Sequence, residues 1–77
     1  MYSAGLQQMG FKDYVGKRIY AKLNSGRTYS GIVTEVTYLG KNPDGVELYL
    51  IMLIDKFGSA VAFSNTEIIL LDEERWQ

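Results

Sequence analysis

The chain has 77 residues, a formal net charge of −1, 47% hydrophobic and 22% charged residues and a single Pro, which predicts one folded domain over residues 1–77 and excludes a disordered, collagen-like or coiled-coil chain. The absence of Cys excludes disulfide bonds and thiolate metal sites, and the absence of His removes the commonest metal ligand and the commonest general base. We therefore expect no metal, no cofactor and no enzymatic activity, and the near-zero charge disfavours duplex DNA, which is bound by massed phosphate neutralisation.

The first part of the chain predicts a short helix. Met1–Gly5 has neither the charged nor the apolar segment of a secretory signal, and no run of 18 apolar residues occurs, so we expect an intracellular, cytoplasmic protein without membrane contact. Between Leu6 and Val15 the apolar residues recur at spacings near three and four. This period predicts an amphipathic helix over about 6–15, with Gly16 as its C-cap.

After this helix the sequence predicts five short strands. They lie over about 17–23, through Tyr29–Val33, and over about 46–55, 60–63 and 68–71. Asn24–Gly26 and Lys41–Gly45 have the composition of tight turns. Five strands in about 55 residues predict a mainly-β fold, a small and strongly bent five-stranded SH3-like barrel over 17–72, followed by an acidic tail over 73–77.

The second strand contains a predicted bend. Val36 follows Val33 by three residues where the pleat of a strand allows two. This spacing predicts a β-bulge or a sharp bend near 34–35. Gly31 in the same strand indicates a tight bend or the close approach of another backbone.

The last three strands are apolar on both faces. Leu48–Ile54 runs without a charge, so its second face needs a cover, which either the N-terminal helix or a neighbouring subunit would supply. Apolar edge strands with unpaired backbone groups invite pairing with another chain. We therefore predict self-association through the last two strands. The predicted interface residues are Ala60, Val61, Ala62, Phe63, Ile68, Ile69, Leu70 and Leu71.

The spacing of the first strand-turn-strand segment resembles the first motif of the Sm-like (Lsm) family. The matching residues are Leu23, Gly26, Tyr29, Gly31 and Val33. The segment from Ala60 to Leu71 is similar in its hydrophobic frame to the second motif, with Phe63, Ser64 and Asn65 in place of Ile, Arg and Gly. The resemblance covers about residues 11–72. It implies a ring of about five to seven copies, in which the fourth strand of each subunit pairs with the fifth strand of the next.

The resemblance also implies binding of single-stranded RNA, but the family's base-reading residues are missing. The family's Asp, aromatic, Met-Asn and Arg positions fall on Thr37, Leu39, Gly40, Lys41 and Ser64. These side chains cannot reproduce the family's uridine pocket. Tyr38 still offers a plane on which a base could stack. The candidate RNA-binding residues are Tyr38, Lys41, Asn42, Ser64 and Asn65.

Each candidate also has a structural interpretation. Tyr38 fits rim packing at a strand end, Lys41 and Asn42 fit a turn, and Ser64 and Asn65 fit hydrogen bonding across a strand connection. Our leading hypothesis is a homo-oligomeric Sm-like ring that binds single-stranded RNA, in RNA processing or regulation, with altered or weak base preference. The alternatives are a structural or protein-interaction ring that has lost RNA binding, and a monomeric SH3-like adaptor for peptides.

Overall fold

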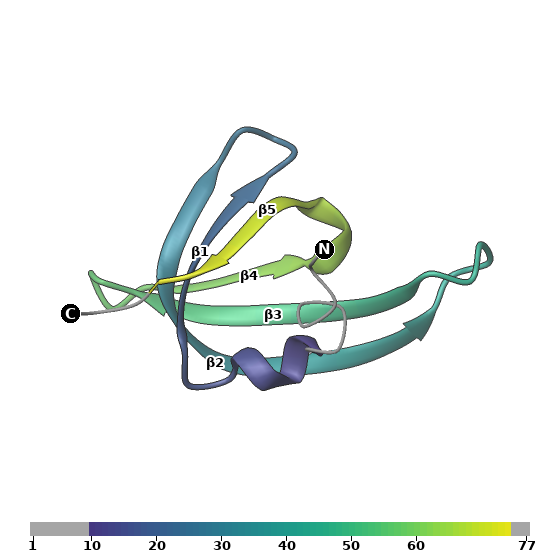
Figure 1. The fold of residues 1–77 in the computed structure, drawn as a ribbon, viewed down its shortest axis with the longest axis horizontal. Coiled ribbons are helices and arrows are strands. Elements are labelled where there is room, and N and C mark those ends of the chain that lie inside the picture. Colours follow the sequence, from purple (N-terminus) through teal and green to yellow (C-terminus); the bar gives the residue numbers. More distant parts are fainter. Residues whose placement is uncertain (1–9, 75–77) are drawn as a thin grey trace, which may run out of the picture.

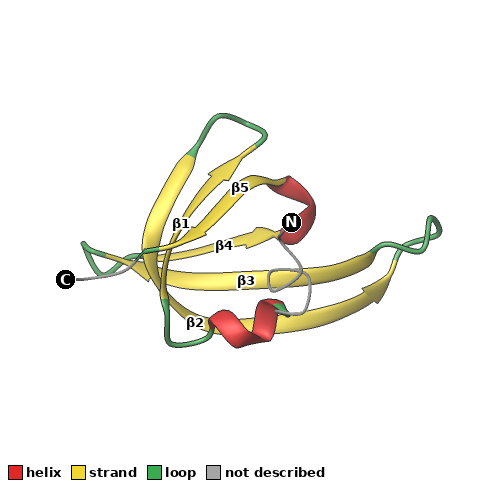
Figure 2. Ribbon diagram, in the orientation of Figure 1, coloured by secondary structure: helices red, strands yellow, loops and turns green. Residues whose placement is uncertain are grey.

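The computed structural model describes residues 10–74, which form five strands and two short 3-10 helices (Figures 1 and 2). The elements are η1 (Phe11–Tyr14), β1 (Arg18–Leu23), β2 (Thr28–Lys41), β3 (Glu47–Asp55), β4 (Ala60–Ser64), η2 (Asn65–Glu67) and β5 (Ile68–Glu73). The predicted mainly-β fold is confirmed. Turns are present at both predicted positions, with Lys41 as the last residue of β2, and β5 continues one residue into the predicted acidic tail.

All neighbouring strands are antiparallel, in the order β4-β3-β2-β1-β5. The sheet curves strongly (Figure 1). It nevertheless differs from the predicted barrel, because within residues 10–74 no ladder joins β4 to β5 and the sheet stays open. Each of these two strands therefore has one side without a strand partner in the described chain.

The predicted bend in the second strand is confirmed. The β2–β3 register shifts between Val33 and Glu35, at the bulge that the spacing of apolar residues indicated. Gly31 allows the close approach that was also predicted, since a Cβ atom on this residue would overlap the carbonyl group of Ile54 in β3. A second register shift, between Tyr38 and Gly40, was not predicted.

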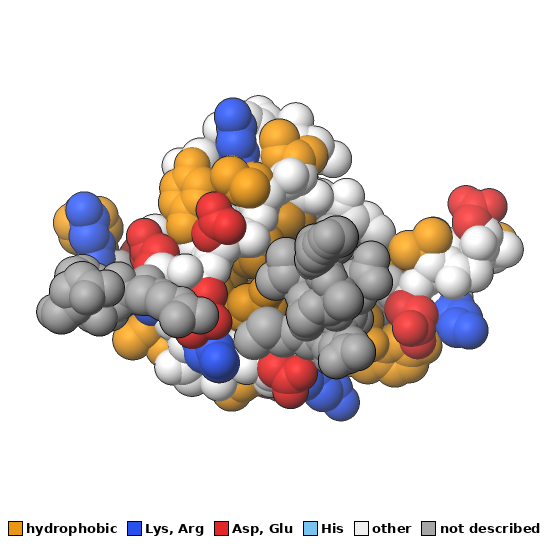
Figure 3. Space-filling model, viewed as in Figure 1, with side chains coloured by type: hydrophobic (Ala, Val, Ile, Leu, Met, Phe, Trp, Pro, Cys, Tyr) orange, Lys and Arg blue, Asp and Glu red, His pale blue; other side chains and the backbone are white. Residues whose placement is uncertain are grey.

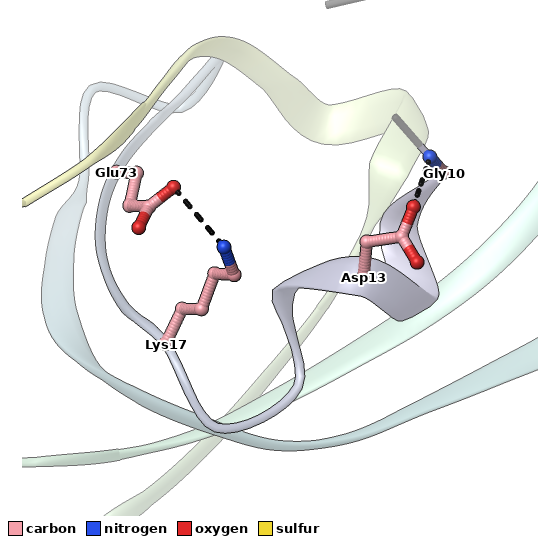
Figure 4. Close-up of polar contacts among 4 residues, drawn as sticks. All are labelled: Gly10, Asp13, Lys17 and Glu73. Carbon is pink, nitrogen blue, oxygen red and sulfur yellow. Dashed lines mark hydrogen bonds and ion pairs between the residues drawn. The ribbon is translucent and has the colours of Figure 1, made fainter. Parts of the chain in front are cut away.

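The predicted N-terminal helix is only partly within the described residues. Residues 6–9 lie outside them, and the rest of the range holds the four-residue 3-10 helix η1 rather than a longer amphipathic helix. The Asp13 carboxylate accepts a hydrogen bond from the Gly10 backbone N at 3.0 Å (Figure 4). After η1, Gly16 has a φ of 87° and its N donates to the Val33 carbonyl at 2.8 Å.

The hydrophobic core lies on the inner face of the curved sheet. Its buried members are Ile19, Ala21, Leu23, Val33, Ile51, Leu53 and Phe63. The alternation of β1 and β3 places the five members on these strands on one face, and β2 and β4 add Val33 and Phe63. The described part of the N-terminal segment covers that same face, because the Phe11 ring lies 5.3 Å from the ring of Tyr49, two residues before Ile51. On the outer face of β3, Met52 is half-buried.

One ion pair ties the beginning of β1 to the end of β5. The Lys17 Nζ lies 3.6 Å from the Glu73 Oε1, and both side chains are partly exposed (Figure 4). A pair of this kind contributes about 1 kcal/mol or less.

No helix within residues 10–74 has the length and apolar character needed to cross a membrane.

Candidate nucleic-acid interface

The β2–β3 hairpin projects beyond the rest of the sheet and ends in a tight turn (Figure 1, right). The Asn42 Oδ1 accepts hydrogen bonds from the backbone N of Asp44 at 2.9 Å and of Val46 at 3.0 Å. Gly45 has a positive φ of 83°, a conformation that glycine adopts readily in a tight turn. The carbonyl oxygen of the Asn42 side chain is therefore engaged in holding the turn.

Tyr38 lies on this hairpin and keeps 43% of its surface exposed. It is opposite Tyr49 in the β2–β3 register, and the two ring centroids are 5.1 Å apart with planes tilted by 51°. Loss of water around the ring, and next its hydrogen bond to the Glu47 carboxylate and that group's negative charge, raise the pKa of the Tyr38 phenol. The side chain is thus neutral at neutral pH and partly exposed to solvent.

Tyr49 is a component of this region that sequence reasoning missed. Its ring stands between those of Phe11 and Tyr38, at centroid distances of 5.3 Å and 5.1 Å. The three rings link η1 to the base of the hairpin. The signal that could have found Tyr49 is the strand register, since a hairpin closed at Lys41–Gly45 brings the residues before and after it face to face.

Asn65 joins the β4–β5 connection to the first residues of β3. Its Oδ1 accepts from the Tyr49 backbone N and its Nδ2 donates to the Glu47 carbonyl, both at 2.9 Å. Tyr38 and Asn65 therefore both interact with Tyr49 and Glu47 of β3. Because both ends of the Asn65 amide are bonded to backbone, this side chain supports the fold and is not available to read a base edge.

Ser64 is also committed to local structure. Its Oγ accepts from the Thr66 backbone N at 3.2 Å, and its own backbone N donates to the Glu67 Oε2 at 2.9 Å. These bonds begin the short helix η2. Ser64 thus serves as a helix cap in the strand connection.

Lys41 is the one basic candidate. It is exposed and lies opposite Glu47 in the register, so its charge is partly balanced. Hydrophobic, acidic and basic side chains occur together on the projecting hairpin, without a patch of one charge sign in that view (Figure 3). Tyr38 and Lys41 together can stack a base and attract a phosphate, which is a chemistry with little sequence selectivity.

The predicted interface residues divide into two groups. Phe63 is only 3% exposed and belongs to the core, while Val61, Ile68 and Leu71 are half-buried against it. Phe63 lies opposite the buried Ile51 in the register, which accounts for its place in the core. The exposed members are Ala60, Ala62, Ile69 and Leu70. Both edge strands therefore show apolar side chains to solvent.

A function is assigned to this chain from these structural features alone. Comparisons of the chain with protein-family models, with curated proteins and with solved structures gave no match. On the projecting hairpin, the described residues offer the exposed aromatic Tyr38 and the cation Lys41, and β4 and β5 offer two apolar sheet edges.

Proposed function

We propose that copies of this chain assemble through β4 and β5 into a homo-oligomeric Sm-like ring that binds single-stranded RNA. The observation that carries the assembly is the strand order, which leaves β4 and β5 at opposite edges of the open sheet. Backbone N–H and C=O groups at an open edge form hydrogen bonds when another strand is added. Pairing the fourth strand of one copy with the fifth strand of the next would use both edges of every subunit in a closed ring.

The RNA part of the proposal depends on Tyr38 and Lys41. Stacking of one base on an aromatic side chain contributes about 1–3 kcal/mol. A single such contact is weak, but a ring repeats it once per subunit, and linked contacts raise the overall affinity. Because Asn65 and Ser64 are hydrogen-bonded within the fold, we propose a weak preference among bases.

A second candidate function is a structural or protein-interaction ring that does not bind RNA. The specific observation in its favour is the double use of the Asn65 amide by the backbone of β3. In this case Tyr38 is a packing residue whose ring contacts the Tyr49 ring across the two strands of the hairpin. Both candidates share the same assembly, so RNA binding is what separates them.

The test measures assembly first and RNA binding second. Native mass spectrometry at micromolar concentration should give a single closed oligomer, and a mass of one chain would reject the ring. Short U-rich and A-rich RNAs are then titrated at low salt with the wild type and with Tyr38→Ala. We expect the variant to keep its oligomeric mass and to bind about fivefold or more weakly. Absence of binding by the wild-type ring would favour the second candidate.

A further inference from the structure

We infer that this chain sets the direction and register of its own strand pairing, through an apolar side chain at one end of the edge and an opposite-charge pair at the other. In this arrangement β4 runs antiparallel to β5 of the next copy. Ile69 of the next copy enters a pocket beside β4, and Asp72 of the next copy meets Lys56. The inference rests on the proposed assembly and specifies its partner surface.

The pocket lies where β4 meets η2 and the β1–β2 turn. It has a volume of about 330 Å³ and is lined by Leu23, Ser25, Arg27, Tyr29, Ala62, Phe63 and Glu67. Leu23 and Phe63 form an apolar floor, at 4% and 3% exposure, and the Tyr29 ring stacks against the Phe63 ring at 5.9 Å. Ala62, on the edge strand, is too small to close it. A side chain from a strand added to β4 can therefore enter the pocket.

Ile69 is the side chain best placed to be that occupant. It is 62% exposed, the highest value for a large hydrophobic residue on either edge strand. Lys22 pairs with Leu70 while Leu23 pairs with Ile68, so Ile69 is the extra residue of a β-bulge in β5. Bulges change the direction in which a side chain points. This one presents an apolar residue at the edge instead of toward the core.

The charges at the other end of each edge are complementary. The turn before β4 carries the exposed Lys56, whose Nζ lies 5.3 Å from the centroid of the Phe57 ring. Lys56 lines a second hollow of about 260 Å³ together with Arg18 and the acidic Asp55. β5 ends in acidic residues. Of these, Glu73 already pairs with Lys17, and Glu74 accepts a hydrogen bond from Ser30, so the exposed Asp72 is the one that no such contact within residues 10–74 engages.

Only an antiparallel pairing places Ile69 of the next copy in the pocket and its Asp72 near Lys56 at the same time. Ile69 and Asp72 are three residues apart, and so are Phe63 and Ala60, which corresponds to about 10 Å along each strand. Placing Ile69 of the next copy beside Phe63 therefore brings its Asp72 to the first residue of β4, next to the turn with Lys56. A parallel strand with Ile69 in the pocket would instead direct Asp72 toward the acidic Glu67.

The direction can be tested by cross-linking, because the chain has no Cys of its own. Single-cysteine variants Lys56→Cys and Asp72→Cys are mixed and mildly oxidised, and the mixed disulfide dimer is identified by mass. We expect this dimer to form in higher yield than the one from Glu67→Cys with Asp72→Cys, which reports the parallel direction. A higher yield from the Glu67→Cys pair, or equal yields, would overturn the proposed direction.

The charge pair is tested by reversal. Sedimentation velocity should show that Lys56→Glu and Asp72→Lys each weaken assembly by about threefold or more, and that the double variant recovers most of the loss. Lys12→Glu, which makes the same charge change on η1, is the matched control and should assemble like the wild type. An assembling wild type whose double variant shows no recovery would reject the charge pair and leave the ring intact.

The apolar contact is tested by truncation. Ile69→Ala should weaken assembly by about tenfold, since the shortened side chain buries much less apolar surface in the pocket. Leu39→Ala, an exposed residue of the hairpin, is the control. Urea unfolding at a fixed low concentration checks that both variants fold. Wild-type assembly in folded Ile69→Ala would refute the contact, whereas a wild type that remains monomeric at any concentration would refute the proposed function itself.

Discussion

The projecting hairpin and the two edge strands differ in whether their polar groups already have partners within the fold. At the base and tip of the hairpin, the side chains that looked suited to RNA recognition are hydrogen-bonded within the fold, as Asn42 and Asn65 show most clearly. At the edges, the outer backbone groups of β4 and β5 have no strand partner within residues 10–74. The comparison teaches that residue type alone does not identify a binding site. Groups already engaged by the fold have little capacity left for a ligand.

The largest expected effect comes from a change in β2, the central strand of the sheet, which also forms one side of the hairpin. Gly31→Ala places a methyl group into the backbone of β3 at Ile54, where no flexible side chain can move aside. We expect the free energy of unfolding to fall by about 2–3 kcal/mol. Urea denaturation monitored by circular dichroism measures this value. A decrease below about 0.5 kcal/mol would mean that the two strands separate easily at this point.

The second effect tests whether the Asn65 amide is structural. Asn65→Ala leaves the Tyr49 N–H and the Glu47 carbonyl without this partner, which should cost about 1–3 kcal/mol of stability. Asn24→Ala, in the exposed β1–β2 turn, is the matched control. Urea denaturation of both variants measures the difference. Equal stability of the two variants would return Asn65 to the set of candidate base-reading residues.

A smaller effect sharpens the RNA side of the comparison. Lys41→Gln should weaken RNA binding several-fold and lower the slope of log affinity against log salt, by about 0.7 for each phosphate that the protein no longer neutralises. Lys12→Gln, on η1, is the control with the same change of charge. Titrations at three salt concentrations give both slopes. An unchanged slope for Lys41→Gln would remove this residue from the site.

The smallest effect concerns pH. Burial of the ring, followed by the negative charges of Glu73 and Asp72, raises the pKa of the Tyr14 phenol. A phenol with a raised pKa in the folded state contributes stability that is fully present below its unfolded value of about 10, and this contribution is lost as the pH rises through the folded pKa. Urea midpoints at about pH 8 and about pH 10.5 should therefore differ less in Tyr14→Phe than in the wild type. An identical difference in both proteins would contradict this role.

The local features of the fold were predictable because neighbouring residues determine them. A step of three between Val33 and Val36 indicated the bulge, and the composition of Lys41–Gly45 indicated the turn. The open sheet was not predicted. Whether β4 meets β5 depends on the accumulated curvature of all five strands, which no short segment contains.

The candidate site shows the same limit. Sequence placed Tyr38 and Asn65 in one proposed site, and the structure does bring both to the start of β3. The sequence did not indicate that Tyr49 and Glu47 would be the residues between them. Their position depends on the strand register across a hairpin that contains an unpredicted bulge at Tyr38 and Gly40.

By itself, the sequence determined the strands, the turns and the bend, because the alternation of apolar residues and the conformational freedom of glycine act over a few residues. Only the tertiary structure decided which polar side chains remain available, since an amide such as that of Asn65 is engaged by backbone 16 and 18 residues away along the chain. It also decided which strands became edges, because strand order is a property of the whole sheet.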